Sequence, residues 1–362
     1  MLKHLLSLWL IGALLTAGVQ GAEQAPAKKT LDTSFIASDS FVVIVIHPRQ
    51  MLAQTPKHSK FVKMMISLVD EESGIQIDNL EQIVVQFGVP EGEDDDIEDK
   101  LVVTMRFAKD VDRARIREKT FTESREAVHD GKKYMRAERD SSPSGYFHDD
   151  RTLIMAKEKR LLKVMAQKQS MGPLVHRLRS IDATSDIVIV GNFHADAARA
   201  ATQELANEMF DQDLPPELVG ALDAGTLTAK LSSDIPIRMQ LDMADEKAAL
   251  GVKKWSESLL TIGRRVFPEL KKEILRDLPS PLDDSLVDAI DKLLNETQVS
   301  VEGNRVHAVL HAKGGLPQVV EVFTFPFVVF SGAFEEDADV TEPEVKDADA
   351  PDEPADTPRP KK

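Results

Sequence analysis

Three short clusters of histidine, arginine and carboxylate side chains in this sequence are candidates for catalysis or metal binding. They are His47 with Arg49, His148 with Asp149 and Asp150, and His194 with Asp196. An imidazole beside a carboxylate can move protons in general acid–base catalysis, and the same groups ligate metal ions. These residues are distant in the sequence, but a catalytic site is defined by geometry and not by sequence spacing. If the fold brought them to one point, they could form the site of a hydrolase or a metal-dependent enzyme.

Each cluster also has a structural explanation. Neighbouring aspartates, such as Asp149 and Asp150, are common in turns, where they accept hydrogen bonds from the local backbone. Strand ends often carry ligand-facing groups in α/β sheets, but a single histidine there, such as His47 or His194, is more often a turn residue or a helix cap. We therefore assign no catalytic, cofactor-binding or metal-ligating residue from the sequence, and all seven residues remain weak candidates.

The signature motifs of several enzyme classes do not occur in the sequence. It contains no cysteine, no Gly-x-Ser-x-Gly nucleophile motif and no glycine-rich phosphate loop. The acidic run Glu91 to Asp99 lacks the glycine that an EF-hand calcium loop needs at its sixth position, which favours a solvated loop. The leading hypothesis is a non-catalytic binding or assembly protein without a cofactor, whose protein or small-molecule partner is unknown. The alternative is a hydrolase or metal-dependent enzyme that uses the dispersed histidines and aspartates.

The overall charge restricts the classes of partner. The 362 residues carry a formal net charge of -16. Nucleic-acid binding requires a basic surface that replaces the counterions of the phosphates, so this composition argues against a nucleic-acid partner.

The N-terminus has the pattern of a secretory signal over residues 1–21. Lys3 precedes an apolar run, and the small residues Val19 and Gly21 stand three and one positions before Ala22. This pattern predicts cleavage before Ala22 and a periplasmic or extracellular location. No second apolar stretch reaches the roughly 20 residues that span a bilayer, so we expect no stable membrane insertion after cleavage.

Two aliphatic strands that are each followed by a helix pattern predict an α+β protein made of two similar halves. The first strand opens residues 41–52 (FVVIVIHPRQML) and the second opens residues 186–199 (DIVIVGNFHADAAR). We predict two tandem copies of a β-α-β-β-α-β-β unit with mainly antiparallel sheets, and a binding cleft or sheet edge between them. The predicted segments are a flexible leader (22–34), the first unit (35–180), the second unit (181–334) with a helical insertion at about 269–294, and a disordered acidic tail (335–362).

Several local patterns give more detailed predictions. Residues 57–70 have the apolar spacing of an amphipathic helix that ends at Gly74. Residues 83–89 and 101–108 are predicted to pair as a hairpin, and Asp110 is expected to cap a helix that continues to about Val128. The dipeptide Gly303-Asn304 indicates a tight hairpin between the last two strands.

These patterns resemble those of one group of bacterial proteins. The leader, the strand that runs into His47, the segment GIQIDNLEQIVVQFG (74–88) and the segment DDRTLIMAKEKRLLKVM (149–165) are similar to those of uncharacterised exported proteins of planctomycete-type bacteria. The resemblance covers most of the chain between about residues 35 and 330. It implies an exported α+β protein, and it implies no activity, catalytic residue or cofactor.

Overall fold

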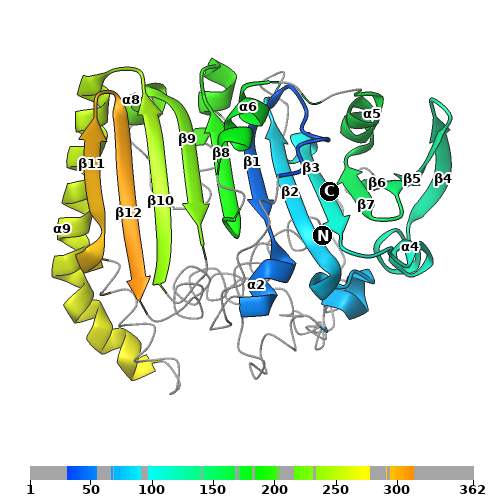
Figure 1. Cartoon of the computed structure of the whole chain (residues 1–362), viewed down its shortest axis with the longest axis horizontal. Helices are drawn as coiled ribbons and strands as arrows, with labels where there is room; N and C mark the ends of the chain where they lie inside the picture. Colours follow the sequence, from blue (N-terminus) through cyan, green and yellow to red (C-terminus); the bar gives the residue numbers. More distant parts are fainter. Residues whose placement is uncertain are drawn as a thin grey trace, which may run out of the picture. The chain divides into compact units, whose positions relative to one another are not determined.

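Twelve antiparallel strands form one continuous sheet in the part of the chain that the structure describes (Figure 1). The structure is a computed structural model, and it describes residues 31–54, 67, 69–90, 97–139, 142–167, 170, 172–181, 184–200, 202–203, 216–230, 234–277, 291 and 294–313. The predicted signal segment, most of the predicted helix at 57–70 and the predicted acidic tail lie outside these residues. The α+β class and the antiparallel pairing that the sequence predicts are confirmed.

The elements have the following bounds in chain order: β1 (Ser40–Ile46), α2 (Pro48–Gln54), η1 (Ile77–Asn79), β2 (Leu80–Gly88), η2 (Ile97–Lys100), β3 (Leu101–Phe107), α4 (Arg113–Thr120), β4 (Ser124–His129), β5 (Lys132–Ala137), β6 (Ser144–Asp149), β7 (Thr152–Ala156), α5 (Glu158–Ala166), α6 (Pro173–Ser180), β8 (Ile187–Asn192), α8 (Pro216–Gly220), β9 (Leu222–Ala229), β10 (Asp234–Met243), α9 (Glu246–Asp277), β11 (Gln298–Glu302) and β12 (Arg305–Lys313). The order of strands across the sheet is β11-β12-β10-β9-β8-β1-β2-β3-β7-β6-β5-β4.

The two aliphatic strands that the sequence singles out lie side by side at the centre of the sheet. β1 pairs with β8 in an antiparallel ladder in which Ile44 lies opposite Ile189. Val43 and Val188 are both 0% exposed, as expected of β-branched strands that are covered on both faces. The predicted cleft between the two halves is therefore absent at this junction, because backbone hydrogen bonds join the halves into one sheet.

The strand order reads the same way outward from the central pair. On one side β1 is followed by β2, β3, β7 and β6, and on the other side β8 is followed by β9, β10, β12 and β11. β5 and β4 extend the first side only. This outer hairpin is consequently the part of the sheet that has no counterpart across the centre.

Glycines end several elements where the sequence predicts a turn. Gly74 has a φ of +70° and its N–H donates to the carbonyl of Asp70, which ends the preceding helix as predicted. The predicted hairpin at residues 303–304 is confirmed, with a φ of +60° at Gly303. The hairpin of β2 and β3 is also confirmed.

The helix predicted from Asp110 to about Val128 is wrong in its second half. α4 is capped by Asp112, whose side chain accepts from the N–H of Arg115, and it ends at Thr120. Residues 124–129 form β4 instead, because Asp130 (φ +48°) and Gly131 (φ +75°) make a two-residue turn that pairs β4 with β5. The turn outweighs the weak helix propensity of the residues before it.

Helices cover both faces of the sheet. On one face, α6 packs on Val43, Val45 and Val188, and α5 packs on the outer strands of the first half. On the other face, α9 packs against β10, β11 and β12 (Figure 1). α9 continues to Asp277 through Pro268, so it includes the first part of the predicted insertion at 269–294.

Candidate functional site

His47 and His194 lie at opposite ends of the sheet. Each histidine follows a central strand, but β1 and β8 run antiparallel. His47 continues β1 to the level of Asp186, which precedes β8, while His194 lies eight residues further along β8. This offset amounts to about 26 Å of strand. The two imidazoles therefore do not share a site.

The surroundings of these two residues indicate structural roles. His47 is buried, and its Nδ1 lies 3.0 Å from the carbonyl oxygen of Ser185, so the ring links α2 to the start of β8. Arg49 is exposed on α2. His194 is exposed, with Nδ1 3.4 Å from a carboxylate oxygen of Asp223.

Asp196 is exposed and begins the helical segment that follows His194 by two residues. Its carboxylate lies 3.4 Å from the guanidinium of Arg199, which also contacts Asp223 at 3.4 Å. The cluster joins the segment after β8 to Asp223 of β9, with His194 and Asp196 exposed and with Arg199 and Asp223 partly buried, so it is explained as a local set of ion pairs.

His148, Asp149 and Asp150 lie at the turn between β6 and β7. Asp149 accepts from the N–H of Arg151 at 2.8 Å, and Asp150 pairs with Arg113 at 2.8 Å. The ring of His148 contacts Phe35 edge-on at 4.8 Å. β6 is four strands away from β1, a separation of about 19 Å. The structure thus does not bring the three clusters together.

No group of three or more histidine and carboxylate side chains is placed to hold a metal ion within the described ranges. Across the same residues, no helix combines the length and apolarity that crossing a membrane requires.

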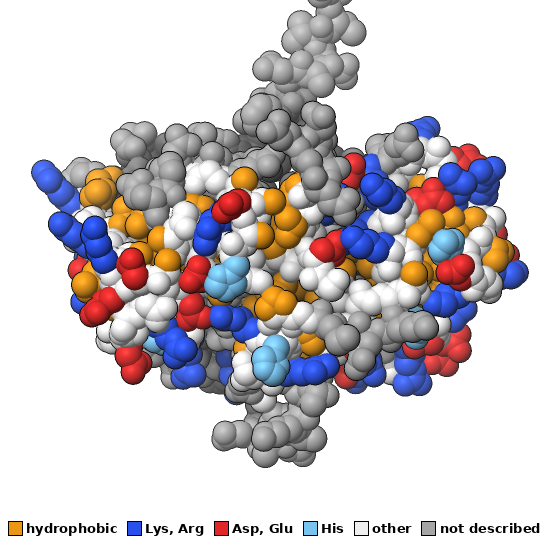
Figure 2. Space-filling view, turned by 90° about the horizontal axis from the view of Figure 1, so that it is seen from above, with side chains coloured by type: hydrophobic (Ala, Val, Ile, Leu, Met, Phe, Trp, Pro, Cys, Tyr) orange, Lys and Arg blue, Asp and Glu red, His pale blue; other side chains and the backbone are white. Residues whose placement is uncertain are grey.

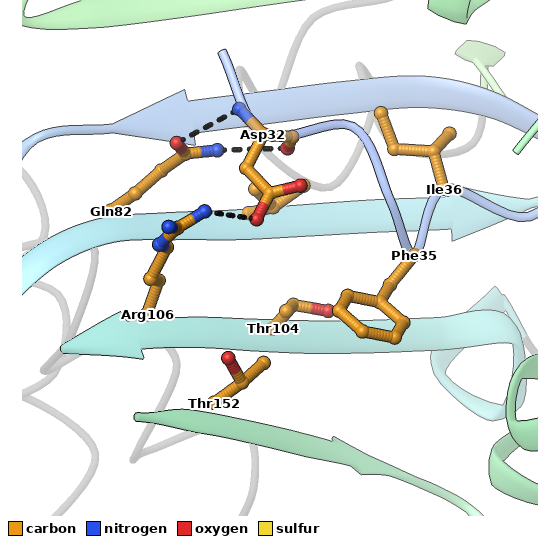
Figure 3. Close-up of a pocket in the computed structure, with 8 residues that line it drawn as sticks. Asp32, Phe35, Ile36, Gln82, Thr104, Arg106 and Thr152 are labelled. Atoms are coloured by element: carbon orange, nitrogen blue, oxygen red, sulfur yellow. Dashed lines mark hydrogen bonds and ion pairs between the residues drawn. The ribbon is translucent and has the colours of Figure 1, made fainter. Parts of the chain in front are cut away.

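A small surface cavity lies beneath the chain segment that precedes β1, which we call the N-terminal strap (residues 31–39). Figure 3 shows this cavity between the strap and strands β2, β3 and β7. Its volume of about 10 Å³ is close to that of a single water molecule. It cannot accommodate a substrate, so its polar residues serve to fasten the strap.

Two glutamines of β2 hold the strap by backbone hydrogen bonds. Gln82 accepts from the N–H of Asp32 at 3.2 Å and donates to its carbonyl at 3.0 Å (Figure 3). Gln86 accepts from the N–H of Ala37 at 2.8 Å and donates to the carbonyl of Phe35 at 2.8 Å. Residues 31–34, the described end of the predicted flexible leader, are therefore attached to the sheet.

Ion pairs add to this attachment at both ends of the strap. Near the start, Arg106 contacts Asp32 at 2.5 Å. At the other end, Asp39 accepts from Arg160 and Lys163 of α5, each at 2.6 Å. Burial alone would raise the pKa of Asp39, but these hydrogen bonds outweigh burial and lower its pKa to about 2.

A larger cavity, which we call the basic groove, has a volume of about 280 Å³ and lies between α4 and strands β4, β5 and β6. Its lining residues are Arg113, Arg117, Glu126, Lys132, Lys133, Tyr134, Met135, Tyr146 and Phe147. Four of these side chains are basic and one is acidic, although the whole chain is strongly acidic. The groove is the candidate functional site of the described residues.

The groove exists because β5 and β6 diverge. They pair only at Met135 and Gly145, whereas the neighbouring strands β4 and β5 pair along six residues. The chain connects β5 to β6 at the Ala137–Ser144 end, so the gap widens toward the turns at residues 130–131 and 150–151. α4 covers one face of the gap and α5 covers the other, through Tyr134, which donates to Glu158 of α5 at 2.6 Å.

The basic side chains of the groove are positioned by aromatic and acidic neighbours. The guanidinium carbons of Arg113 and Arg117 lie 5.4 and 5.9 Å from the ring centre of Phe147, within range for cation–π attraction. Lys133 pairs with Glu126 at 2.7 Å, and this hydrogen bond lowers the pKa of Glu126. Arg117 is exposed and forms no ion pair with any described residue.

Lys132 has a separate partner at the α5 side of the groove. Its ammonium group donates to the carbonyl of Met165 at 2.6 Å, near the end of α5, where a cation is favoured by the helix dipole. Figure 2 shows basic and acidic side chains intermixed at the end of the molecule that carries the β4–β5 hairpin, as they are elsewhere on this face. Arg117 is thus the groove cation that is most available to a ligand.

The interpretation of the sequence missed every residue of this groove. One feature of the sequence could have indicated it: residues 112–139 contain nine basic and six acidic side chains in a chain with a net charge of -16. The predicted helix from Asp110 to about Val128 covers much of this stretch, and in a helix the basic residues would point in several directions. The strand pair β4–β5 instead directs Lys133 toward the helix that carries Arg117.

Comparisons with known proteins do not establish a family for this chain. No family model and no curated protein matches the sequence. Two crystal forms of TP0453, a Treponema protein, are similar in structure. Form I is 10% identical and covers 83% of this chain and 99% of TP0453, with a TM-score of 0.40. Form IV is 12% identical and covers 80% and 95%, with a TM-score of 0.38.

At these identities and TM-scores, the likeness to TP0453 supports no argument about function. The resemblance to exported proteins of planctomycete-type bacteria stays a prediction.

Proposed function

We propose that this protein is an exported, non-catalytic binding or assembly protein that holds an anionic group of its partner in the basic groove. The observation that carries this proposal is the excess of cations around a cavity of about 280 Å³ in an acidic chain. The groove is built on the hairpin that has no counterpart across the centre of the sheet. Binding sites are commonly additions to a scaffold that is otherwise structural.

The side chains of the groove suit a carboxylate or another small anion. A guanidinium group offers paired donors that match the two oxygens of a carboxylate. Arg117 is held beside Phe147 and forms no direct ion pair with a described residue, although its charge attracts Glu126 and helps to lower the pKa of that carboxyl, so a ligand need not break a direct ion pair. The alternative enzyme hypothesis gains no such support, because His47 follows β1, His148 lies near the end of β6 and His194 follows β8, at separate places in the sheet.

Removing the charge of Arg117 is expected to weaken anion binding. The probe is fluorescein-labelled hexaglutamate, titrated against the full chain at low ionic strength and followed by fluorescence anisotropy. Arg117→Gln should raise the Kd about three- to tenfold, which corresponds to roughly 0.7 to 1.4 kcal/mol for one exposed charged contact. Lys133→Gln should have a smaller effect, because Glu126 already pairs with Lys133.

The matched control for Arg117→Gln is Arg125→Gln. Arg125 is exposed on β4 and does not line the groove, so its substitution makes the same change in net charge elsewhere. The proposal requires that Arg125→Gln leave the Kd nearly unchanged. Equal losses for the two variants would show that only general electrostatic attraction operates, and hexaglutamate that fails to bind the unaltered protein would exclude the site.

We also propose that the two sides of the sheet are copies of one ancestral unit. The matching strand order on the two sides of the β1–β8 pair supports this proposal. The positions of Phe107 and Met243 also support this proposal. Phe107 ends β3 and Met243 ends β10, both side chains are 1% exposed, and a helix follows each of them. β4 and β5 would then be an addition to the first copy.

Equivalent positions of the two copies should respond equally to the same substitution. Val43 and Val188 occupy matching positions in β1 and β8, and both are 0% exposed. Val43→Ala and Val188→Ala should each cost about 2 kcal/mol of unfolding free energy, because each removes two buried methyl groups. Urea denaturation measures both values, and a difference of more than about 1 kcal/mol, well beyond the usual scatter between independent sites, would contradict the equivalence.

A further inference from the structure

The gap between β5 and β6 exposes backbone groups as well as basic side chains. His129 and Lys132 close the β4–β5 hairpin, so the backbone N–H and C=O groups of Lys132 and Tyr134 point toward β4. Those of Lys133, Met135 and Ala137 point toward β6. Two contacts agree with this alternation, since Met135 pairs with Gly145 and the N–H of Ala137 donates to the Ser144 hydroxyl at 3.0 Å.

The ladder between these strands stops one step before the groove. Continuing the register from Met135 and Gly145 would place Lys133 opposite Phe147, but β5 and β6 form no pair there. Both residues line the groove. The backbone groups that would have paired them face the same space as the guanidinium of Arg117.

We propose that the groove accepts an extended acidic segment of a partner protein, which enters the gap as an additional strand. This inference rests on the proposed anion-binding function and specifies its ligand. The backbone of the segment would pair with that of Lys133, as in other cases of strand addition. Its side chains would alternate between the two faces of the gap, because successive residues of a strand point in opposite directions.

The two faces of the gap select an alternating pattern in the partner. Arg113, Arg117 and Lys133 lie toward α4, so carboxylates are favoured at every second position. Tyr134 and Tyr146 line the face toward α5, where apolar side chains would pack. A segment that alternates acidic and apolar residues, such as repeated Glu-Val, therefore fits the groove better than a uniformly acidic one.

The experiment compares three fluorescein-labelled peptides on the full chain at low ionic strength. They are an alternating Glu-Val octapeptide, the same peptide with methyl groups on alternate amide nitrogens, and hexaglutamate. Methylation removes backbone donors and leaves the charge unchanged. We expect it to raise the Kd at least tenfold, and we expect the unmethylated peptide to bind more tightly than hexaglutamate.

Three variants locate the contact with the backbone. Lys133→Pro removes the N–H that faces the gap and should weaken the alternating peptide much more than Lys133→Gln, which removes only the charge. Val128→Pro is the control, because Val128 lies on the outer edge of the sheet, is 63% exposed and directs its N–H away from β5. It should leave binding unchanged.

The outcomes separate strand addition from simple anion binding. Equal binding of the methylated and unmethylated peptides would overturn strand addition and leave the anion site intact. Loss of binding in Val128→Pro would place the added strand on the outer edge of β4 and also overturn the inference. Tighter binding of inorganic polyphosphate than of either peptide would overturn the peptide ligand in favour of a phosphate. If no acidic probe binds, the proposed function fails, and the inference fails with it.

Discussion

Replacing Asp39 by Ala should lower the free energy of unfolding by about 3 kcal/mol, the low end of the cost of breaking a buried ion pair. Arg160 is 5% exposed and donates to Asp39 at 2.6 Å, so the substitution leaves a buried guanidinium without its counter-ion. We take the low end because Asp39 itself is 28% exposed. Urea denaturation followed by circular dichroism would measure the loss.

Two further variants test whether the unpaired Arg160 causes that loss. In the double variant Asp39→Ala with Arg160→Met, most of the stability should return, because no buried charge remains. Lys163→Ala should cost less than about 1 kcal/mol, since Lys163 is 53% exposed and its pair with Asp39 is screened by solvent. If the double variant is no more stable than Asp39→Ala, the buried charge is not the cause.

The same carboxylate predicts how acid affects the protein. The pKa of Asp39 falls from 3.8 to about 2 on folding, so the ionised form is favoured in the folded state. Its contribution is complete above a pH of about 4 and is lost as the pH falls toward about 2. The stability difference between the unaltered protein and Asp39→Asn should therefore shrink over this interval.

Gly145→Ala should destabilise the protein by about 3 kcal/mol, near the upper end for overpacking a tightly filled site. A Cβ atom at Gly145 would lie 2.1 Å from the tip of the Phe121 ring. Phe121 is buried and follows α4 directly, so it can yield only if the end of α4 moves. Thermal and urea denaturation would both record the loss, and hexaglutamate binding should weaken with it because α4 carries Arg117.

Gly220→Ala and a second substitution provide the controls. Nothing lies within 4 Å of a Cβ atom placed at Gly220, so that variant should be nearly neutral. Adding Phe121→Leu to Gly145→Ala shortens the obstructing ring and should restore part of the stability. A Gly145→Ala variant as stable as the unaltered protein would mean that the ring can turn aside without moving the helix.

The sequence predicts those elements whose local pattern and environment agree. Most of the β-branched residues of β1 and β8 are buried, and the positive φ angles at positions 74 and 303 are ones that glycine adopts more readily than other residues. The pairing of β1 with β8 was not predicted, because it depends on two complementary edges and not on either segment alone. The predicted sites failed for a related reason, since the antiparallel pairing sends His47 and His194 in opposite directions.

The groove was beyond prediction because it results from a departure from regular pairing. The residue types of β5 and β6 do not indicate that the two strands pair only at Met135 and Gly145. The local excess of basic residues was visible, but the assumption of a continuous helix through residue 128 concealed that β4 and β5 form a hairpin. Correct assignment of the Asp130-Gly131 turn would have placed Lys133 and Glu126 on adjacent strands.

The central position of β1 has a consequence for how the chain reaches its folded state. Ile44 and Ile189 are paired at the middle of the sheet although they are 145 positions apart in the sequence. During synthesis, one edge of β1 has no neighbour until β8 has emerged, and an unpaired aliphatic edge is a template for aggregation. Contacts between such distant segments also slow folding, because a long loop must close before they form. A chain truncated after its first half would leave this edge of β1 unpaired. The second half, through β8, therefore protects the first half from edge-to-edge aggregation.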